Sequence, residues 1–463
     1  MTDSINLILT YVVEVFSLIL VLIILSGRRE ARANFSWVMA VIFFPVIGTL
    51  AYLIFGNPRL RNIVEKRMKR YPFLDYKQAG NAEYNGGKMG AIITQVTGMQ
   101  PVLCRNLRLI TDASEKYSLL ERDIKNAQKY ILMEYYLYRN DKTGRRIADL
   151  LVKKAEEGVS VFFMVDGWGS MGLMFSGLMK RLRRAGAQTA VFHSPFGIRT
   201  ASRVNFRNHR KIAVIDGKCA YTGGMNIGDE YAETSKWSDA HLRLEGDAVN
   251  AVACYFAEDW MFARGGDISE MLAEGAEQSS GDQTVHVIPS GPHQTTPMIY
   301  DSIFAAINRA EKSIDIITPY LVPNQPIMET LKNTAMQGLR VRIIVPGKNN
   351  HPFAAAAGRS YYEELIASGV EIYETKGTML HAKMILLDGR WVTIGSSNMD
   401  ARSFKLNFEL NLMIYSDKFA SDVSEMVERY IEASEKIPYE YVKNRQFFIR
   451  VFEGVCRTLS PVL

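Results

Sequence analysis

The order of hydrophobic and polar residues separates an apolar N-terminal segment from the rest of the chain. Two long apolar runs, Ile5–Leu25 and Phe35–Phe55, contain one charged residue between them, Glu14. Each run is long enough to cross the ~30 Å apolar core of a bilayer as a helix. We therefore expect a transmembrane helical hairpin within residues 1–60. Glu14 is expected to be protonated or paired with a neighbouring helix.

Beyond residue 100 the pattern changes to short apolar runs rich in Val and Ile, which alternate with amphipathic helical segments. The helical segments end at glycines, a residue that favours helix C-termini: Gly158, Gly186, Gly338 and Gly369. Alternation of strands and helices predicts an α/β fold with a largely parallel sheet.

This alternation occurs twice. The first copy contains KYILMEYYLY, VSVFFMVDGWG and NHRKIAVIDGKCAYTGGMN, and the second contains KSIDIITPYLVP, LRVRIIVPGKNN and LHAKMILLDGRWVTIGSSN. Two copies predict two α/β domains related by a pseudo-twofold axis, with the site where equivalent strand ends face each other. The expected organisation is a hairpin, a basic linker and two domains, over residues 1–60, 61–100, 101–280 and 281–463.

The second domain is expected to end in an amphipathic helix. Its apolar face carries Phe448, Val451, Phe452, Val455 and Leu459, and its other face carries Arg450, Glu453 and Arg457. Such a helix suits the interface between water and lipid. The alternative is that it packs on the protein's own core.

The distribution of basic residues predicts the orientation of the chain in the membrane. The loop between the apolar runs holds Arg28, Arg29 and Arg32, and a denser basic stretch follows the second run with Arg59, Arg61, Lys66, Arg67, Lys69 and Arg70. Because basic residues stay on the cytoplasmic side, the chain is predicted to be a multi-pass protein of the cell membrane whose domains are cytoplasmic. A cleaved signal peptide is the alternative. The length of the first run and the lack of positive charge before it argue against cleavage.

The composition argues against a disordered chain, a disulfide framework and a metal site. The 463 residues are 48% hydrophobic and 22% charged with a net charge of +6, which indicates a globular chain with a membrane contribution. The charge alone is weak evidence for nucleic-acid binding. The four cysteines form no CxxC pair and the seven histidines show no HxxxH spacing, so neither a disulfide framework nor a metal site is expected.

The candidate chemistry lies in a motif that occurs once in each copy. The residues of the motif are His209, Lys211, Asp216 and Asn226 in the first copy, and His381, Lys383, Asp388 and Asn398 in the second. In both copies the Asp follows the His by seven positions and the Asn by seventeen. A single HxK triplet means little. Two extended copies in register with a wider repeat are a specific signal.

Strand geometry indicates which members of the motif can lie together in a site and which cannot. Residues two apart in a strand share a face, so each His and its Lys point the same way. Asp216 and Asp388 lie too far along an extended strand to orient the histidines, and each precedes a glycine, as in a tight turn. We keep both aspartates in the candidate set and expect them to have a structural role.

Better candidates to orient the imidazoles are Asp239 and Glu409, each one strand beyond the Asn of its own copy. There the chain can return beside its own histidine, so Asp239 is expected to pair with His209 and Glu409 with His381. A carboxylate that accepts a ring N–H fixes the tautomer and stabilises the imidazolium. The alternative is that each acid is a solvated strand residue.

Two His, two Lys and two Asn that meet across a pseudo-twofold suit a phosphodiester. Ammonium and amide groups can hold the non-bridging oxygens while one histidine attacks phosphorus and the other protonates the leaving alkoxide. No metal or cofactor is required. Because Arg207 and Arg210 flank His209, we expect His209 to remain neutral and to be the nucleophile.

These motifs resemble the HKD signature of the phospholipase D superfamily. The wider context is similar to bacterial cardiolipin synthases in NFRNHRKIAVIDGKCAYTGGMNIGDEY, in WSDAHLRLEG, in SGP at residues 290–292, in the apolar hairpin and in the final LSPVL. The resemblance implies that a phosphatidyl group passes from one phosphatidylglycerol to another with release of glycerol. It assigns the site to His209, Lys211, Asn226, His381, Lys383 and Asn398, with Asp239 and Glu409 as orienting acids.

One position departs between the two copies, because Gly224 stands where the second copy has Ser396. The first half-site is therefore expected to lack a hydroxyl donor to phosphate. Other functions remain open: a plain phospholipase, a nuclease or a membrane scaffold that needs no histidine. The expected partners are a phospholipid substrate and the membrane, without nucleic acid. The oligomeric state is not predicted.

Overall fold

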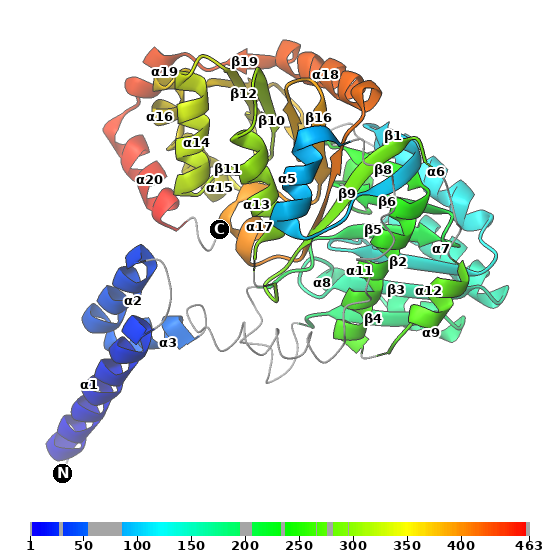
Figure 1. Ribbon diagram of the computed structural model, residues 1–463. Coiled ribbons are helices and arrows are strands. Elements are labelled where there is room, and N and C mark those ends of the chain that lie inside the picture. The colour runs from blue at the N-terminus through cyan, green and yellow to red at the C-terminus, as the bar shows by residue number, and fades with distance from the viewer. Residues whose placement is uncertain are drawn as a thin grey trace. The chain divides into compact units, whose positions relative to one another are not determined.

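The structure is a computed structural model, and it describes residues 2–26, 31–53, 86–194, 206–232, 237–264, 266–275, 281–294 and 296–459 (Figure 1). The chain divides into two units. The first comprises Met1–Lys66 with Phe196–Asn205, and the second comprises Arg67–Pro195 with Phe206–Leu463. The predicted basic stretch over residues 59–70, the arginines at 28 and 29, and residues 460–463 lie outside the described residues.

In its described residues the first unit has the helices α1 (Thr2–Ser26), α2 (Ala31–Phe43) and α3 (Pro45–Ala51). A small apolar core joins them through Leu20, Ile24, Val41 and Tyr52. The second apolar run was expected to be one helix, and this is wrong. The run breaks at Phe44, because Pro45 has no backbone N–H to continue the helix and instead begins α3.

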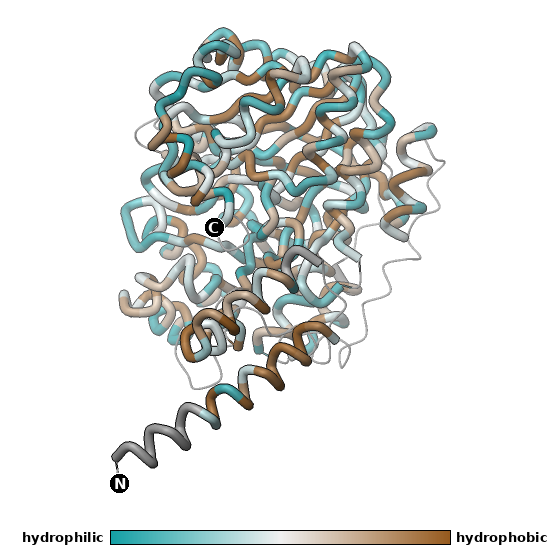
Figure 2. Tube along the Cα trace, turned by 90° about the vertical axis from the view of Figure 1, so that its left-hand side faces the viewer, coloured by the Kyte–Doolittle hydropathy of each residue, from teal (hydrophilic) through white to brown (hydrophobic). Residues whose placement is uncertain are grey.

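The expected membrane-spanning helices are not confirmed. Among the residues that the structure describes, no helix is both long enough and apolar enough to cross a membrane. Hydrophobic residues nonetheless make up most of the coloured part of α1 (Figure 2).

The second unit is built on one sheet of fifteen strands that contains two equivalent halves. The first half has the order β1 (Val102–Ile110), β8 (His241–Glu245), β6 (Cys219–Gly223), β5 (Lys211–Ile215), β2 (Tyr130–Tyr135), β3 (Ser160–Asp166) and β4 (Gln188–Phe192). The second half has the order β9 (Gln283–Ser290), β18 (Glu409–Ile414), β16 (Trp391–Gly395), β15 (Met384–Leu387), β10 (Ser313–Ile317), β12 (Arg340–Pro346) and β13 (Glu371–Thr375), with β19 (Ser434–Lys436) at the edge.

The matching strand orders bear out the repeat. β1 pairs with β9 in antiparallel fashion and joins the two halves into one sheet. The expectation of a largely parallel sheet is wrong, because only β2–β3–β4 and β10–β12–β13 are parallel. The motif strands instead form hairpins, β5 with β6 and β15 with β16. Their Asp-Gly turns require positive φ at both positions, and such turns connect antiparallel strands.

Helices cover both faces of each half (Figure 1). In the first half, α6 (Ala113–Lys125), α7 (Lys142–Glu156) and α9 (Leu178–Arg184) lie on one face and α11 (Asp247–Arg264) on the other. In the second half, α13 (Met298–Ile307), α14 (Gln325–Met336) and α16 (Tyr362–Ala367) lie on one face and α18 (Asp417–Glu432) on the other. The four predicted glycines follow α7, α9, α14 and α16, all with positive φ. Each half has its own apolar core.

Shorter elements complete the unit. The helices are α5 (Gly87–Thr97), α8 (Met171–Phe175), α10 (Asp229–Ala232), α12 (Ser269–Gly275), α15 (Pro352–Arg359), α17 (Ala401–Lys405), α19 (Tyr439–Lys443) and α20 (Phe447–Thr458). Two-stranded ladders pair β7 (Trp237–Ser238) with β14 (Met379–Leu380) and β11 (Leu321–Val322) with β17 (Met399–Asp400). Helix α5 lies in the predicted linker and buries Met89 and Ile93 in the core of the second half.

Candidate functional site

Each candidate histidine lies beside a chain segment from the other half of the molecule. The backbone N–H of His209 donates to the carbonyl of Phe408 at 2.8 Å, and that of His381 donates to the carbonyl of Ser238 at 2.7 Å. The short parallel ladder of β7 with β14 extends the second contact. The two motifs are thereby held against each other where the halves meet.

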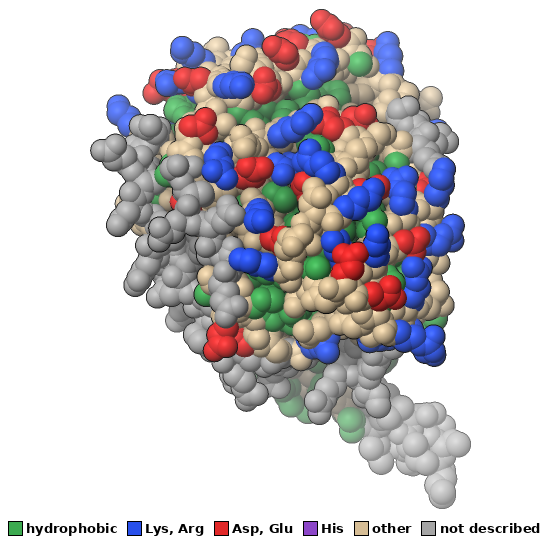
Figure 3. Space-filling view, turned by 90° about the vertical axis from the view of Figure 1, so that its right-hand side faces the viewer, with side chains coloured by type: hydrophobic (Ala, Val, Ile, Leu, Met, Phe, Trp, Pro, Cys, Tyr) green, Lys and Arg blue, Asp and Glu red, His purple; other side chains and the backbone are tan. Residues whose placement is uncertain are grey.

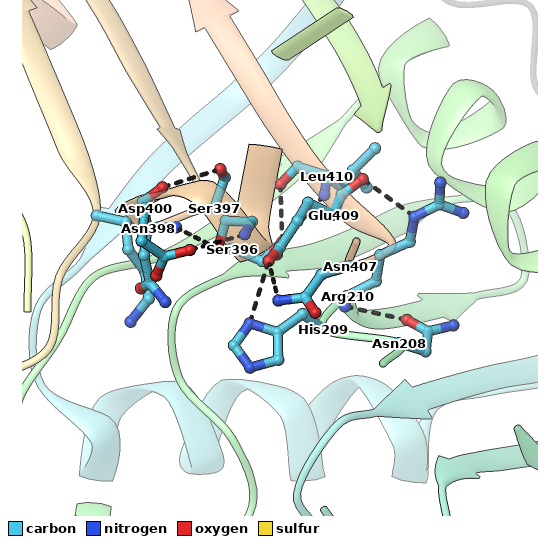
Figure 4. Close-up of polar contacts among 12 residues, drawn as sticks. Asn208, His209, Arg210, Ser396, Ser397, Asn398, Asp400, Asn407, Glu409 and Leu410 are labelled. Carbon is cyan, nitrogen blue, oxygen red and sulfur yellow. Dashed lines mark hydrogen bonds and ion pairs between the residues drawn. The ribbon is translucent and has the colours of Figure 1, made fainter. Parts of the chain in front are cut away.

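This arrangement crosses the expected pairing of the acids. Glu409 Oε1 lies 3.2 Å from His209 Nδ1 (Figure 4), and Asp239 Oδ2 lies 2.6 Å from His381 Nδ1. The prediction that each acid orients the histidine of its own copy is wrong. Each acid does follow the Asn of its own copy, as expected. However, the residue before the acid pairs its backbone with the opposite motif, so the carboxylate reaches the opposite imidazole.

The two lysines occupy equivalent positions. Lys211 Nζ donates to the His209 carbonyl at 2.6 Å, and Lys383 Nζ donates to the His381 carbonyl. Both lysine side chains are buried. Each His and Lys therefore share one side of the chain, as the spacing of two residues predicts.

Burial and mutual repulsion shift every basic group in the cluster. Burial, reinforced by the nearby lysine charges, lowers the pKa of both His209 and His381 to about 4. Burial likewise lowers the pKa of Lys211 to about 8 and that of Lys383 to about 7. Lys383 contributes to the shift of His209, and Lys211 to the shift of His381, so the two half-sites act on each other electrostatically.

The pKa values of the two acids are also lowered, which for a carboxyl group favours the charged form. Burial disfavours ionisation of Asp239, but the charges of Lys383 and His381 outweigh it and keep the pKa of this carboxyl below its usual value. Burial also opposes ionisation of Glu409, whose pKa is held low by His209 and Lys211. Two carboxylates among four basic groups, all buried, form a nearly neutral cluster that can accept an anion.

The two asparagines follow the motif hairpins and are buried. Asn226 Oδ1 accepts the N–H of Leu137 at 3.2 Å, and Asn226 Nδ2 donates to the hydroxyl of Tyr231 at 2.8 Å. The backbone N–H of Asn398 donates to Ser403 Oγ at 3.1 Å. These contacts fix the side chain of Asn226 and the backbone of Asn398.

The difference between Gly224 and Ser396 has another meaning than the one predicted from sequence. Ser396 Oγ donates to Glu409 Oε2 at 2.6 Å and is fully buried, so it orients the acid and is not available to phosphate (Figure 4). At Gly224 an added Cβ would lie 2.0 Å from Asp239 Oδ1. The two half-sites therefore differ in how they hold their acids: Ser supports Glu in one, and Gly leaves room for Asp in the other.

Asp216 and Asp388 do not belong to the site. The Asp216 carboxylate accepts backbone N–H groups of Gln128, Lys129 and Tyr130. The Asp388 carboxylate accepts those of Glu311, Lys312 and Ser313. Each aspartate closes the Asp-Gly turn and anchors the start of the adjacent strand, which confirms the predicted structural role and removes both from the catalytic candidates.

The two arginines that were expected to single out His209 are engaged by other residues. Arg210 is fully buried, with Nη1 2.7 Å from Asp259 Oδ2 and Nε donating to the Glu409 carbonyl at 3.1 Å. The Arg207 guanidinium lies over the Trp168 ring at 4.8 Å. Neither arginine is among the main causes that lower the pKa of His209, which are burial and the charge of Lys211. The arginines are therefore no basis for choosing the nucleophile.

Sequence reasoning missed two site residues. The Trp237 ring lies 5.0 Å from the His381 ring, and Asn407 Nδ2 donates to Glu409 Oε1 at 3.1 Å. Both stand two positions before an acid, in WSD and NFE, so their shared offset was a usable signal. Tyr136 covers His209 with ring centroids 4.3 Å apart.

Within the described residues, no group of three or more His, Cys, Asp or Glu side chains is placed to hold a metal ion. The site offers instead a pair of imidazoles, a pair of ammonium groups and amide donors. Such a set can bind a phosphodiester, form a phosphorus–nitrogen bond and move a proton.

Comparison with known proteins places this geometry in a family. A family described as cardiolipin synthase, phospholipase D-like domain, matches residues 120–260 and 303–431, and a phospholipase D-nuclease N-terminal family matches residues 15–57. A cardiolipin synthase of Alkalihalophilus pseudofirmus is 36% identical over 96% of this chain and 91% of its own. Cardiolipin synthase 1 of Bacillus cereus is 32% identical over 95% of this chain and 91% of its own.

The fold is also similar to a solved structure. The phosphatidylserine synthase of Haemophilus influenzae superposes with a TM-score of 0.62 at 16% identity, over 81% of this chain and all of that one. That likeness concerns the fold alone. With the family match over more than half of the residues and relatives that span nearly the whole length, the chain belongs to the phospholipase D-like family of cardiolipin synthases.

Proposed function

We propose that this chain is a cardiolipin synthase, a phosphatidyltransferase that moves a phosphatidyl group from one phosphatidylglycerol to the free hydroxyl of another and releases glycerol. The observation that carries the proposal is the pair of His–Lys motifs brought together by the two halves, each histidine oriented by a carboxylate from the other half. The names of the relatives along nearly the whole chain support the same activity.

The proposed reaction has two displacements. In the first, His209 attacks phosphorus to form a P–N bond as the P–O bond to glycerol breaks, and His381 gives its proton to the leaving oxygen. In the second, a hydroxyl of the other phosphatidylglycerol loses its proton to His381 and attacks phosphorus, which breaks the P–N bond. Lys211, Lys383 and the site asparagines would hold the non-bridging oxygens.

Hydrogen bonding favours His209 as the nucleophile. The Asp239–His381 contact is short at 2.6 Å, whereas Glu409 lies 3.2 Å from His209 and also accepts from Ser396 and Asn407. Asp239 also accepts the backbone N–H of Ala240 at 2.8 Å, so the distinction lies in the shorter contact between Asp239 and His381, which stabilises an imidazolium more. His381 therefore holds a proton more readily once the anionic substrate is bound, and His209 stays neutral.

A product assay tests the proposal against its nearest competitor. Vesicles of radiolabelled phosphatidylglycerol are expected to yield a dimeric lipid and free glycerol. Phosphatidic acid as the main product would identify a phospholipase instead. A nuclease is not favoured, and on the face in Figure 3 acidic and basic side chains are interspersed, unlike a continuous basic groove.

The proposed reaction requires no metal ion, since imidazole groups supply the nucleophile and the proton donor and ammonium groups supply the positive charge. Cardiolipin formation is therefore expected to survive exhaustive chelation with EDTA. Turnover that is lost on chelation and restored by one divalent ion alone would contradict the proposal. Parallel assays at constant ionic strength control for screening of the anionic lipid surface.

We further propose that α1–α3 hold the enzyme at the cell membrane, with the catalytic halves on the cytoplasmic side. The support is a set of exposed apolar side chains on α1: Tyr11, Val12, Val15, Phe16, Leu18, Ile19, Leu22, Ile23 and Leu25. The basic residues after position 58 support the orientation. The expected domain boundaries near residues 60, 100 and 280 belong to this proposal.

Deletion of residues 1–60 tests the anchor. None of the fifteen-stranded sheet is removed, so the remainder is expected to fold. Turnover should fall mainly on vesicles and much less on detergent-dispersed phosphatidylglycerol. Equal losses in both assays would mean that the deleted residues form part of the catalytic unit.

Helix α20 offers a second contact with lipid. Its charged face is turned toward the protein: Arg457 pairs with Glu364 at 2.9 Å, and the buried Glu453 pairs with Arg445. Its apolar face points outward, with Phe448 81% exposed. A helix with its polar face packed and its apolar face exposed is suited to a bilayer surface. The charged face supplies the packing on the protein, and the exposed apolar face supports the proposal of a lipid contact.

The double variant Phe448→Ser with Phe452→Ser tests this contact. Each phenylalanine contributes about 1.5–3 kcal/mol when it enters an apolar phase, so vesicle turnover should fall by about tenfold or more. Activity in detergent should be unchanged. Met336→Ser, which removes an exposed apolar side chain from α14, is the matched control. A loss of the same size in the control would remove the role of α20.

A further inference from the structure

A cavity of about 590 Å³ opens where the two halves meet, on the side of His381. Its volume lies within the range of ligand-binding pockets. The walls come from the start of α6, from α10 and β7 in the first half, and from the end of β13 and α18 in the second. Half of the lining residues carry a hydroxyl group: Thr111, Ser114, Tyr231, Ser238, Thr375, Thr378 and Tyr430.

Two aromatic residues connect the cavity to the candidate site. Trp237 lines the cavity and its ring lies 5.0 Å from the His381 ring. Tyr231 also lines the cavity, and its hydroxyl accepts from Asn226 Nδ2 at 2.8 Å. The backbone carbonyl of Ser238 accepts a hydrogen bond from the backbone N–H of His381. The cavity is therefore adjacent to the His381 half-site.

The chemistry of the lining suits a neutral group that carries several hydroxyls. Ser238 Oγ and the Tyr430 hydroxyl lie 2.7 Å apart and can donate or accept. The charged residues are otherwise engaged: Asp112 caps α6 through the Ser114 N–H at 2.9 Å, and Lys376 lies 3.5 Å from Glu435. A phosphate would require converging cations, whereas a polyol requires donors and acceptors such as these.

The corresponding place in the other half is filled. Phe192 ends β4 as Thr375 ends β13, and Phe408 precedes Glu409 as Ser238 precedes Asp239. The rings of Phe192 and Phe408 lie 4.9 Å apart, and Phe262 lies 5.1 Å from Phe192. Aromatic rings thus pack the His209 side at positions where the His381 side is hollow and carries hydroxyls.

We infer that this cavity binds the glycerol headgroup of phosphatidylglycerol, both the one that leaves and the one that accepts. The inference rests on the proposed function and names the subsite that makes the enzyme a transferase. In-line attack by His209 puts the departing glycerol oxygen opposite the new P–N bond, beside His381. The acceptor hydroxyl must attack opposite the same bond, give its proton to His381 and therefore enter from the same side.

The test fills or alters the cavity in the full-length enzyme on vesicles of radiolabelled phosphatidylglycerol. Thr375→Phe copies the aromatic residue of the other half, and Tyr430→Phe removes one hydroxyl. With the acceptor excluded, water takes the phosphatidyl group, so the ratio of cardiolipin to phosphatidic acid should fall. We expect a drop of about tenfold or more for Thr375→Phe through steric exclusion. Tyr430→Phe should lower the ratio roughly threefold to tenfold through a lost hydrogen bond.

The reverse reaction supplies a second readout. With cardiolipin and labelled free glycerol as substrates, both variants should raise the glycerol concentration for half-maximal formation of phosphatidylglycerol. Tyr373→Phe, which removes a hydroxyl bonded to Glu371 outside the cavity, is the control. If Thr375→Phe fails to fold, the product ratio and the glycerol dependence of Tyr430→Phe and Thr378→Val provide the test. An unchanged product ratio and glycerol dependence in the folded variants would overturn the inference. A wild-type enzyme that forms no cardiolipin would overturn the proposed function itself.

Discussion

His209→Ala and His381→Ala are each expected to lower cardiolipin formation by about 10⁴-fold or more, with no change in binding to phosphatidylglycerol vesicles. Residues that act as one catalytic unit lose nearly all of the acceleration when any member is removed. Both variants are expected to fold, because alanine keeps the backbone N–H that pairs each position with the opposite half.

The two losses differ in what they leave on the enzyme. Rapid acid quenching after mixing with phosphatidylglycerol labelled in the phosphatidyl group should place label on the peptide that contains His209. His381→Ala should still form some of this adduct and hydrolyse it slowly, because it lacks the base for the second step. His209→Ala should form none. Label on the peptide with His381, and absent from that with His209, would reverse the assignment.

Much of the second unit was predictable because the repeat is local in sequence. Each motif places His and Lys on one side of the chain, and each Asp-Gly pair forms the turn that its position suggested. The glycines that end four helices were found for the same reason, since a positive φ is a property of one residue and its neighbours. The largely antiparallel pairing of the sheet was not predicted. The two Asp-Gly turns indicate antiparallel hairpins, and this consequence was not drawn from them.

The pairing of the acids could not be read from either copy alone. It depends on the segments Arg207–His209 and Phe408–Glu409 lying side by side, which are contacts between halves. The same applies to Arg210, whose charge is visible in the sequence but whose partner Asp259 lies on α11. Local spacing identifies which residues are functional, and the long-range interface decides which of them touch.

The crossed pairs give the two half-sites unequal roles that can be separated by substitution. Asp239→Asn and Glu409→Gln keep the volume of each acid and remove its charge. We expect each to lower cardiolipin formation by about 10⁴-fold, as when a carboxylate that orients a catalytic histidine is replaced by its amide. The reason differs between them: Asp239→Asn removes the anion that stabilises protonated His381, and Glu409→Gln disturbs the tautomer of His209.

A substrate with a good leaving group tells the two effects apart. With p-nitrophenol in place of the glycerol headgroup, the leaving oxygen needs no proton, so His381 is not required for the first displacement. Asp239→Asn should then release its first equivalent of p-nitrophenol at nearly the wild-type rate, whereas Glu409→Gln should remain slow because His209 is still needed to attack. Thermal unfolding of both variants checks that the buried carboxamides are tolerated. Recovery by Glu409→Gln alone would mean that His381 is the nucleophile. Equal behaviour of the two variants would contradict the division of roles that the 2.6 Å and 3.2 Å contacts predict.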